Sequence, residues 1–344
     1  MKPTNISKIL VFRLSSIGDI ILTTALLRCL RNEFPNAQID FVVKKQFAPI
    51  LRCVPYISNV IELDAKQGFV GIESLKNRLL ATRYQVVLDI HKNWRSMYIR
   101  KSIKANLVLT FNKHVFRRWV LTTFHKDIYK EVRPVYLRFI DTAAPIGVKP
   151  DGKGTELIVQ HDIQQSVDDI YAANHVDITK PIVAFCPGAS FTNKQWPAEK
   201  FAELAKRIVS DLNIQVVLIG GKNEQALCET IIRESGVTVV SLAGALDLSQ
   251  SIAALYRVKA TVANDTGMLH ASEALGVPVI GIYGATARQF GYYPILPTSK
   301  VAEVDLPCRP CTKMGMNSCP KGHFACMQTL SAEHVFALLK EVIK

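Results

Sequence analysis

Short apolar runs alternate with amphipathic helical patterns along almost the whole chain, and this alternation restricts its possible folds more than any other feature. In the first half we expect strands at residues 9–14, 39–43, 60–63 and 86–90, and helices at 20–32 and 72–81. In the second half we expect strands at residues 182–185, 216–219, 237–240, 261–263 and 279–283, and helices at 198–210, 224–235, 248–258 and 267–275. Strands separated by helices form parallel sheets covered on both faces. The sequence therefore predicts an α/β fold.

The chain is long enough for two domains. Its 344 residues exceed the length at which one hydrophobic core usually stops growing. The stretch "PIGVKPDGKGTE" at residues 145–156 combines proline, glycine and charge, as linkers do. We therefore predict two Rossmann-like, doubly wound domains at residues 1–155 and 156–344, with the last helix free to pack back on the first. Their sheets would face a central cleft, where ligands of open α/β folds bind.

The sequence shows no sign of export or of membrane insertion. No apolar stretch approaches the roughly 18–20 residues that a membrane-spanning helix needs. The first residues, "MKPTNISKILVF", lack the apolar core and the cleavage site of a signal peptide. We therefore expect the protein to be cytoplasmic.

Positive charge is concentrated in one part of the chain. The net charge is +13, and residues 92–133 hold eleven lysines and arginines against Asp127 and Glu131, so this basic segment alone carries +9. Six aromatic residues are interleaved with these charges: Trp94, Tyr98, Phe111, Phe116, Trp119 and Phe124. The combination suits anionic lipid head groups, acidic saccharide or nucleic acid, but a solvated helical face has the same composition. These alternatives stay open.

The strand at residues 9–14 runs into a polar turn. A dinucleotide-binding fold would place Gly-x-Gly-x-x-Gly there, whereas this chain reads Ser-Ser-Ile-Gly-Asp from Ser15 to Asp19. An aspartate at a helix start is commonly a cap, because it accepts free backbone N–H groups and suits the helix dipole. The small side chains at Ser15, Ser16 and Gly18 also leave room for a ligand, whose hydroxyl could give its proton to Asp19. Asp19 is therefore either a cap or a general base.

The stretch "ANDTGMLHASEALG" in the second half predicts an anion site. Asp265, Thr266 and Gly267 stand between a strand and a helix, where free backbone N–H groups and the threonine hydroxyl suit a diphosphate. Asp265 would repel phosphate, so it more naturally binds hydroxyls or fixes the loop. His270, one helical turn later, is either a packed core histidine or a ligand contact.

Two further strand ends of the second half have features of nucleotide-binding loops. Lys194, in "CPGASFTNKQWPAEKF", can neutralise the charge of a departing phosphate or be an exposed loop cation. In "LIGGKNEQAL", Gly220 and Gly221 allow a close approach, and Glu224 can hydrogen-bond a ribose. Three such turns in one sheet indicate a nucleotide site more strongly than any one of them.

Four of the eight cysteines lie close together near the end of the chain: Cys308, Cys311, Cys319 and Cys326. The first two form a Cys-x-x-Cys half-site for zinc, but the spacing of the second pair differs from the usual zinc ribbon. Reduced structural thiols are the alternative expected in a reducing cytoplasm.

Four stretches together resemble the lipopolysaccharide heptosyltransferases, the glycosyltransferase family 9 group of GT-B enzymes that transfer heptose from an ADP-sugar. They are "RLSSIGDIILTTALLRCL" at residues 13–30, "LDIHKNWRS" at 88–96, "FTNKQWPAEKFAELA" at 191–205 and "ANDTGMLHASEALGVPVIGIYGAT" at 263–286. The likeness runs over nearly the whole chain, and the combination in this order is more specific than any single stretch.

The resemblance implies inverting transfer of heptose from ADP-L-glycero-D-manno-heptose, with Asp19 as the general base. ADP-heptose would be a substrate, and neither a cofactor nor a metal would be required. The implied donor contacts are Lys194, Ser190 and the Asp265-Thr266-Gly267 turn for the diphosphate, Glu224 for the ribose, the backbone near Leu246 for the adenine, and His270.

The resemblance also implies an acceptor, the inner core of lipopolysaccharide, with Kdo or heptose on lipid A receiving the sugar. Its anionic groups would explain the basic segment. The acceptor side would include Ser15, Ser16, Gly18, Asn93, Arg95 and Ser96. The first domain would bind the acceptor and the second the nucleotide-sugar, with the protein in peripheral contact with the inner leaflet of the inner membrane. Nucleic acid is not an expected partner, and the sequence does not indicate an oligomeric state.

Two other functions remain compatible with the sequence. One is a glycosyltransferase of the same family that uses another nucleotide-sugar. The other is a basic protein that binds a membrane surface or nucleic acid and whose nucleotide loops have no catalytic use.

Overall fold

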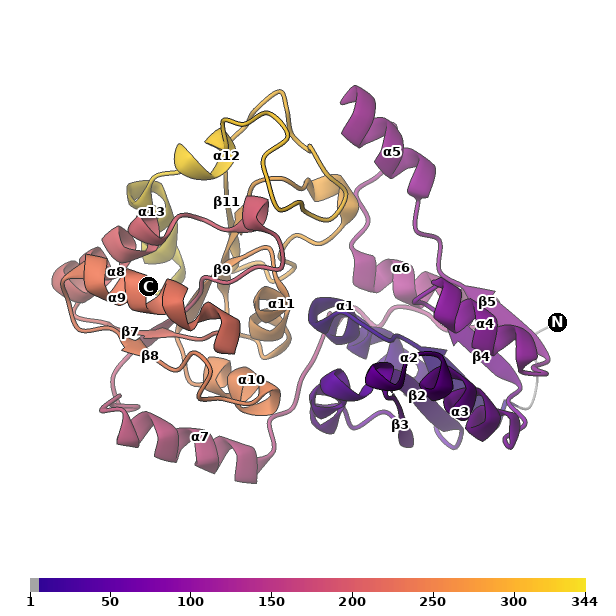
Figure 1. Ribbon diagram of the computed structural model, residues 1–344. Helices are drawn as coiled ribbons and strands as arrows, with labels where there is room; N and C mark the ends of the chain where they lie inside the picture. The colour runs from indigo at the N-terminus through magenta and orange to yellow at the C-terminus, as the bar shows by residue number, and fades with distance from the viewer. Residues whose placement is uncertain (1–5) are drawn as a thin grey trace. The chain divides into compact units, whose positions relative to one another are not determined.

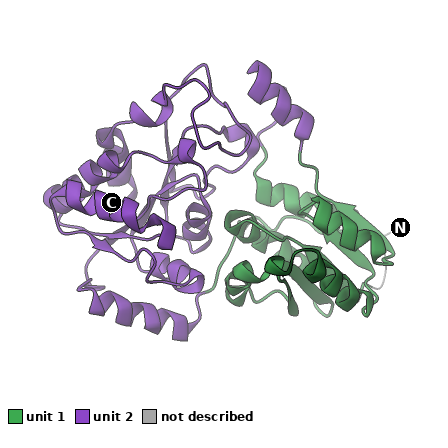
Figure 2. Ribbon diagram, in the orientation of Figure 1, with its two compact units in different colours: residues 1–113, 133–158 green, residues 114–132, 159–344 purple. Residues whose placement is uncertain are grey.

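The computed structural model describes residues 6–344, which form two compact units. Unit 1 runs to Lys113 and includes residues 133–158, whereas unit 2 contains residues 114–132 and 159–344, as Figure 2 shows. Residues 1–5, the start of the segment in which we expect no signal peptide, lie outside the described residues. No helix among the described residues is both long enough and apolar enough to cross a membrane.

Unit 1 is built on a five-stranded parallel sheet (Figure 1). Its strands are β1 (Lys8–Phe12), β2 (Gln38–Lys44), β3 (Asn59–Leu63), β4 (Val86–Asp89) and β5 (Leu107–Thr110). The order across the sheet is β3-β2-β1-β4-β5, and every neighbouring pair is parallel. The buried residues of β1, β2 and β4 pack with apolar residues of α3 and α4 in one core. The predicted strands of this half are confirmed, and β5 falls inside the basic segment.

The helices of unit 1 are α1 (Ile17–Leu22), α2 (Thr24–Glu33), α3 (Gly68–Leu80), α4 (Trp94–Ser102) and α6 (Val135–Thr142), with short 3-10 turns η1 (Lys45–Cys53), η2 (Ala65–Gln67) and η3 (Ala144–Ile146). The single helix predicted at residues 20–32 is wrong, because two helices meet at Thr23. The Thr23 and Thr24 hydroxyls bond back to the carbonyls of Asp19 and Ile21 at 2.7 and 2.8 Å. Threonine hydroxyls that bond in this way interrupt or bend a helix.

Unit 2 contains a six-stranded parallel sheet in the order β11-β10-β9-β6-β7-β8. Its strands are β6 (Ile182–Cys186), β7 (Gln215–Leu218), β8 (Val240–Ser241), β9 (Ala260–Asn264), β10 (Val279–Tyr283) and β11 (Lys300–Glu303). Counted within the unit, this is the order of dinucleotide-binding folds. The strand expected at residues 237–240 is reduced to β8, which starts at its last residue.

Eight α-helices belong to unit 2: α5 (Val115–Phe124), α7 (His161–Ala173), α8 (Ala198–Leu212), α9 (Gln225–Ser235), α10 (Leu248–Tyr256), α11 (Gly267–Ala274), α12 (Ala325–Gln328) and α13 (Ala332–Val342). Trp196 and Phe201 lie in its core beside apolar residues of α9 and α13. The last helix, α13, packs on α8 and β11 of this same unit.

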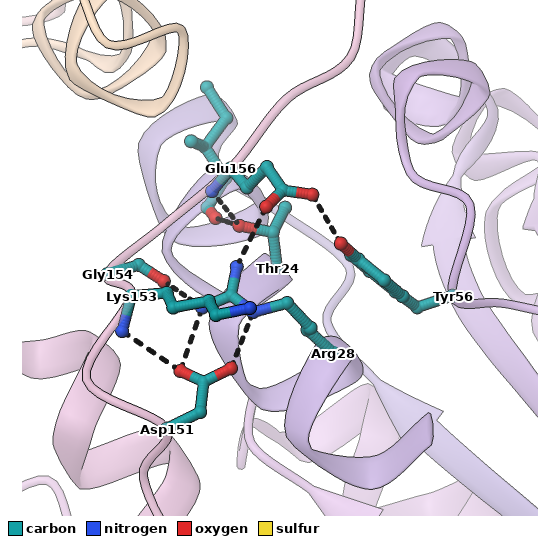
Figure 3. A network of polar contacts seen from close by, with 8 residues as sticks. Thr24, Arg28, Tyr56, Asp151, Lys153, Gly154 and Glu156 are labelled. Carbon is teal, nitrogen blue, oxygen red and sulfur yellow. Dashed lines mark hydrogen bonds and ion pairs between the residues drawn. The ribbon is translucent and has the colours of Figure 1, made fainter. Parts of the chain in front are cut away.

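The segment predicted as a linker is anchored to α2 (Figure 3). Arg28 on α2 donates to both carboxylate oxygens of Asp151, at 2.6 and 3.0 Å, and to the carbonyl of Gly154 at 2.7 Å. Glu156 accepts from Tyr56, and its backbone N–H donates to Thr24 Oγ1 at 3.0 Å. These contacts keep residues 151–156 within unit 1, so the chain crosses into unit 2 only after residue 158.

Candidate functional site

Each sheet has one point at which successive connections leave neighbouring strands in opposite directions. In unit 1 this switch point lies between β1 and β4, and in unit 2 it lies between β6 and β9. Ligands of open α/β sheets bind at such points, outside the carboxyl ends of the strands. The four stretches on which the resemblance rests lie at the ends of these strands: residues 13–30 follow β1, 88–96 begin in β4, 191–205 follow β6 and 263–286 begin in β9.

Asp19 lies at the switch point of unit 1, in the first turn of α1. Ser16 holds the N-cap position of that helix with an extended backbone, so Asp19 is the third helical residue. The carboxylate oxygen Oδ2 forms an ion pair with the Arg13 guanidinium and accepts from Ser16 Oγ at 3.2 Å. The side chain of Asp19 is 15 % exposed. Its carboxylate is thus held in place and still accessible.

Arg13, the partner of Asp19, is held in place by two further contacts within unit 1. Its second terminal nitrogen, Nη1, donates to the carbonyl of Ile90, just after β4, at 2.8 Å. Its guanidinium carbon lies 5.4 Å from the centre of the Phe139 ring, within cation–π distance. Sequence reasoning missed Arg13, although its place at the end of an apolar strand is a signal, because a buried arginine usually needs a partner.

His91 is a second residue of this site that sequence reasoning missed, although it lies inside "LDIHKNWRS". Burial, together with the positive charges of Arg13, Lys113 and Lys44, lowers the pKa of His91 to about 3, and the Asp19 carboxylate opposes this shift only in part. Its Nε2 lies 2.8 Å from Asn93 Nδ2, and its Nδ1 is buried with no hydrogen-bond partner among the described residues. His91 is therefore a neutral imidazole beside Asp19.

The acceptor-side residues predicted at the start of α4 have structural contacts of their own. Asn93 is the N-cap and forms a reciprocal capping box with Ser96. Ser96 is fully buried, and its hydroxyl donates to Asp89 Oδ2 at 3.0 Å. Arg95 lies over the ring of Trp94, 4.5 Å from its centre. Two of these three residues thus shape the loop after β4. Ser15 and Ser16 lie beside Asp19 at the solvent-accessible side of the turn, and Gly18 is buried.

At the switch point of unit 2, a lysine pairs with an aspartate. Lys194 comes from the 3-10 turn η4 (Thr192–Lys194) after β6, and its Nζ lies 2.7 Å from Oδ2 of Asp265, which follows β9. The Thr286 hydroxyl donates to the same oxygen at 2.8 Å. Asp265 therefore fixes the loop, as one interpretation of the sequence expected, and Lys194 compensates its charge.

Thr266 and Gly267 begin α11, with Thr266 as the N-cap. The Thr266 hydroxyl is buried and has no hydrogen-bond partner among residues 6–344. A buried hydroxyl is almost always hydrogen-bonded, so one without a protein partner at a helix N-terminus suits a ligand. His270 is 5 % exposed, with its ring 6.2 Å from that of Tyr292.

Asn264 holds the two loops of this switch point together, and sequence reasoning missed this function. Its Oδ1 accepts from the backbone N–H of Trp196 at 3.1 Å, and its Nδ2 donates to the carbonyl of Pro187 at 2.7 Å. Asn264 is fully buried at the end of β9. It thereby sets the position of the loop that carries Lys194.

The remaining donor-side residues lie at the ends of β6, β7 and β8. Glu224 accepts from the backbone N–H of Gly221 at 2.6 Å, and a side chain at Gly188 or Gly220 would collide with its carboxylate. Glycine at these two positions therefore lets the carboxylate approach both strand ends. Ser190 is exposed, and Leu246 is half-buried just before the N-cap of α10.

Several positive charges of the basic segment have partners within the protein. Arg100 pairs with Asp89 at 3.1 Å and Arg133 with Asp141 at 2.6 Å. Arg118 stacks on the rings of Phe290 and Tyr292, 5.5 and 5.8 Å from their centres. Part of this segment therefore has a structural role.

The cysteines near the end of the chain differ in their surroundings. No group of three or more His, Cys, Asp or Glu side chains in the described part of the chain is arranged to hold a metal ion. The Cys308 sulfur lies 3.9 Å from His323 Nε2. Burial raises the pKa of Cys319, but the backbone N–H groups of residues 321–324 together lower it below the usual value.

Comparison with known proteins places this architecture in a family. The family described as glycosyltransferase family 9 (heptosyltransferase) matches residues 72–321. Lipopolysaccharide heptosyltransferase 2 of Escherichia coli strain K12 is 28% identical, over 82% of this chain and 84% of the relative.

Solved structures of this family share the fold. A glycosyl transferase family 9 protein from Veillonella parvula superposes with a TM-score of 0.83 at 21% identity, covering 98% of this chain and 97% of that one. The E. coli heptosyltransferase WaaC with ADP gives a TM-score of 0.71 at 19% identity, covering 97% and 99%. The two parallel α/β sheets thus match the predicted GT-B-like fold, and the chain belongs to glycosyltransferase family 9, the heptosyltransferases.

Proposed function

We propose that this protein transfers heptose, with inversion, from ADP-L-glycero-D-manno-heptose to Kdo or heptose of the lipopolysaccharide inner core on lipid A. The observation that carries the proposal is the Asp19 carboxylate, held by Arg13 and Ser16 at the switch point of unit 1. A fixed and accessible carboxylate is what a general base requires. The names of the relatives, which are lipopolysaccharide heptosyltransferases, support the same substrate class.

Asp19 accepts the proton of the acceptor hydroxyl in this mechanism. The hydroxyl oxygen forms a bond to the anomeric carbon while the bond between that carbon and the phosphate oxygen breaks. ADP leaves from the opposite face with the bonding electron pair. Arg13 keeps the carboxylate oriented, because its guanidinium is bound at the same time to the Ile90 carbonyl. His91 stays neutral at working pH and so adds no second positive charge beside the base.

The donor diphosphate binds at the switch point of unit 2. Lys194 neutralises the developing charge on the departing phosphate, exchanging Asp265 for phosphate oxygen or bridging both. The unpartnered Thr266 hydroxyl and the first N–H groups of α11, from Gly267, supply donors to the same anion. Ser190 adds a diphosphate contact, Glu224 holds the ribose, the backbone near Leu246 contacts the adenine, and His270 lines the donor side.

These residues support catalysis without a metal ion. Lysine and helix N–H groups stabilise a leaving diphosphate by the same electrostatic means as a divalent cation. We therefore propose that ADP-heptose is the nucleotide substrate and that no cofactor takes part. The related E. coli WaaC was solved with ADP, which supports the choice of nucleotide.

The acceptor side is assigned to unit 1, around Asp19 and the loop after β4. An inner core that carries phosphate and carboxylate groups would complement the charges of the basic segment that remain exposed, such as Lys92, Lys101 and Lys104. Of the three acceptor-side residues expected in "LDIHKNWRS", Arg95 is the one that does not cap α4, so its side chain is the one of the three that we assign to an acceptor anion.

The experiment incubates the full chain with ADP-heptose, or with UDP- and GDP-sugars, and measures the nucleotide released with and without a deacylated inner-core acceptor. We expect ADP release that depends on the acceptor and that persists in the presence of EDTA. The anomeric configuration of the product, measured by NMR, should be opposite to that of the donor. Release from UDP- or GDP-sugars alone would overturn the heptose assignment, and loss of activity with EDTA would overturn metal independence.

A further inference from the structure

Helix α5 exposes an unusual set of side chains. Val115, Phe116 and Phe124 are 63, 66 and 62 % exposed, and Trp119 is 43 % exposed. Their aromatic rings form a chain, with 6.0 Å between the centres of Phe116 and Trp119 and 5.3 Å between those of Trp119 and Phe124. At 100° per residue, Val115, Phe116 and Trp119 share one side of the helix. We call the three aromatic residues, Phe116, Trp119 and Phe124, the aromatic ridge.

The side of α5 that faces its own unit is held by Arg118 and Leu121. Arg118 stacks on Phe290 and Tyr292, and Leu121 is only 4 % exposed. Gln289 donates to Asp127 in the loop after α5 at 3.0 Å. Large apolar side chains thus occupy the exposed side of this helix, where polar and charged residues are usual. The ridge faces outward because the arginine contacts hold the opposite side of the helix.

The charge around the ridge is positive. Residues 113–133 hold six lysines and arginines against Asp127 and Glu131, a net charge of +4. Lys126 and Lys130 are exposed, whereas Asp127 is engaged by the Tyr129 N–H at 2.8 Å as well as by Gln289. An outward row of tryptophan and phenylalanine beside lysines is typical of helices that lie in a membrane interface.

Other occupants fit this surface less well. A second copy would bring one positive surface against another and would be repelled. Nucleic acid recognition places lysine and arginine toward the ligand, whereas here the outward row is apolar. A helix of ten residues is about 15 Å long, so it can lie along a bilayer surface but cannot cross it.

We propose that the aromatic ridge of α5 docks on the surface of an anionic phospholipid bilayer. The phenylalanines and the tryptophan insert at the level of the head groups, and Lys126 and Lys130 contact lipid phosphates. The inference rests on the proposed function in one respect, since an enzyme whose acceptor is built on lipid A must work at a membrane. The proposal assigns the membrane contact to α5. The chain belongs to unit 1 before residue 114 and again from residue 133.

The experiment measures co-sedimentation of the full chain with vesicles of phosphatidylethanolamine and phosphatidylglycerol, with phosphatidylcholine vesicles as the uncharged comparison. We expect binding to the anionic vesicles only, weakened by added salt. The double variant Phe116→Ser/Trp119→Ser should bind at least about tenfold more weakly. Lys126→Glu/Lys130→Glu should reduce binding and abolish the preference for anionic lipid.

Phe69→Ser is the matched control. Phe69 is 56 % exposed on α3, so the substitution removes a similar exposed ring from another helix and should leave vesicle binding unchanged. Fluorescence gives a second measurement. The chain has three tryptophans, and Trp196 is buried, so in Trp94→Phe the exposed indole belongs to Trp119. Its emission should shift to shorter wavelength with anionic vesicles.

Equal vesicle binding by the Phe116→Ser/Trp119→Ser variant and by the unchanged chain would overturn the proposal. So would tighter binding to single-stranded nucleic acid, or a dimer in light scattering that this variant abolishes. Turnover on the deacylated, water-soluble acceptor separates this inference from the proposed function. The Phe116→Ser/Trp119→Ser variant should keep the turnover of the unchanged protein on this acceptor. If the unchanged protein shows no turnover, the proposed function fails, and vesicle binding still tests membrane docking by the ridge.

Discussion

The switch points of the two sheets are built alike, but they hold their carboxylates differently. At each, an aspartate just after a strand pairs with a cation and accepts from a hydroxyl: Arg13 and Ser16 for Asp19, Lys194 and Thr286 for Asp265. Arg13 is also bound to the Ile90 carbonyl and lies over Phe139, whereas Lys194 reaches its partner from a 3-10 turn.

The difference bears on the roles that we propose for the two carboxylates and the two cations. A guanidinium bound on two sides is a fixed support, which fits the proposal that the Asp19 carboxylate is the reactive group at the first switch point. An ammonium on a flexible stem changes partner easily. At the second switch point the comparison fits the proposal that Asp265 is the support and that Lys194 meets the incoming phosphate.

The largest expected effect is on Asp19. Asp19→Asn removes the proton acceptor while keeping the size of the side chain, so turnover should fall by about 10²–10⁴-fold. The affinity for ADP, measured by calorimetry, should not change. The counterpart Asp265→Asn should instead raise the KM for the donor, because it disturbs Lys194. A lower melting temperature with near-normal turnover in Asp19→Asn would mean that Asp19 only supports α1.

The next effect, about 10²-fold, is expected for Lys194→Ala, because it removes the cation that stabilises the leaving phosphate. The kcat/KM for ADP-heptose should fall, and the KM for the acceptor should stay the same. Lys200, a half-buried lysine on α8 that follows the same loop, supplies the matched variant Lys200→Ala, for which we expect little change. A loss confined to the acceptor KM would contradict the assignment of Lys194 to the donor side.

A smaller effect tests the difference between the two cations. Arg13→Lys keeps the charge but has one nitrogen to serve both Asp19 and the Ile90 carbonyl, so kcat should fall about tenfold. The exchange at the other switch point, Lys194→Arg, should retain more donor binding than Lys194→Ala. Unchanged kcat in Arg13→Lys would show that charge alone, without the second contact, is enough beside Asp19.

How much of this site the sequence predicts depends on where each partner comes from. Asp19, Lys194 and the Asp265-Thr266-Gly267 turn stand at strand ends, so the alternating pattern alone brings them to the sheet edges. Their supports were missed because Arg13 contacts Ile90 and Asn264 contacts Trp196, over separations that no local pattern encodes. The contacts of the predicted linker were missed for the same reason, since composition gives no sign that Arg28 binds Asp151. The strands were easier to predict, because the run of apolar residues in each strand indicates by itself that the strand is buried.

The last expected effect concerns stability rather than turnover, and it concerns the first switch point. Burial and neighbouring cations hold the pKa of His91 at about 3, against an ordinary value of 6.5 in the unfolded chain. Between these values the unfolded state binds more protons than the folded state, so His91 makes the free energy of unfolding fall as the pH drops from about 6.5 to 3, by up to about 1.4 kcal/mol per pH unit.

In the variant His91→Gln, the melting temperature should therefore depend less on pH between about 6.5 and 3. His161→Gln, on the exposed start of α7, is the control and should leave the profile unchanged. Identical slopes for the His91 variant and the unchanged chain would mean that His91 is protonated in the folded state, and a charged imidazole beside Asp19 would then compete with Arg13 for the base.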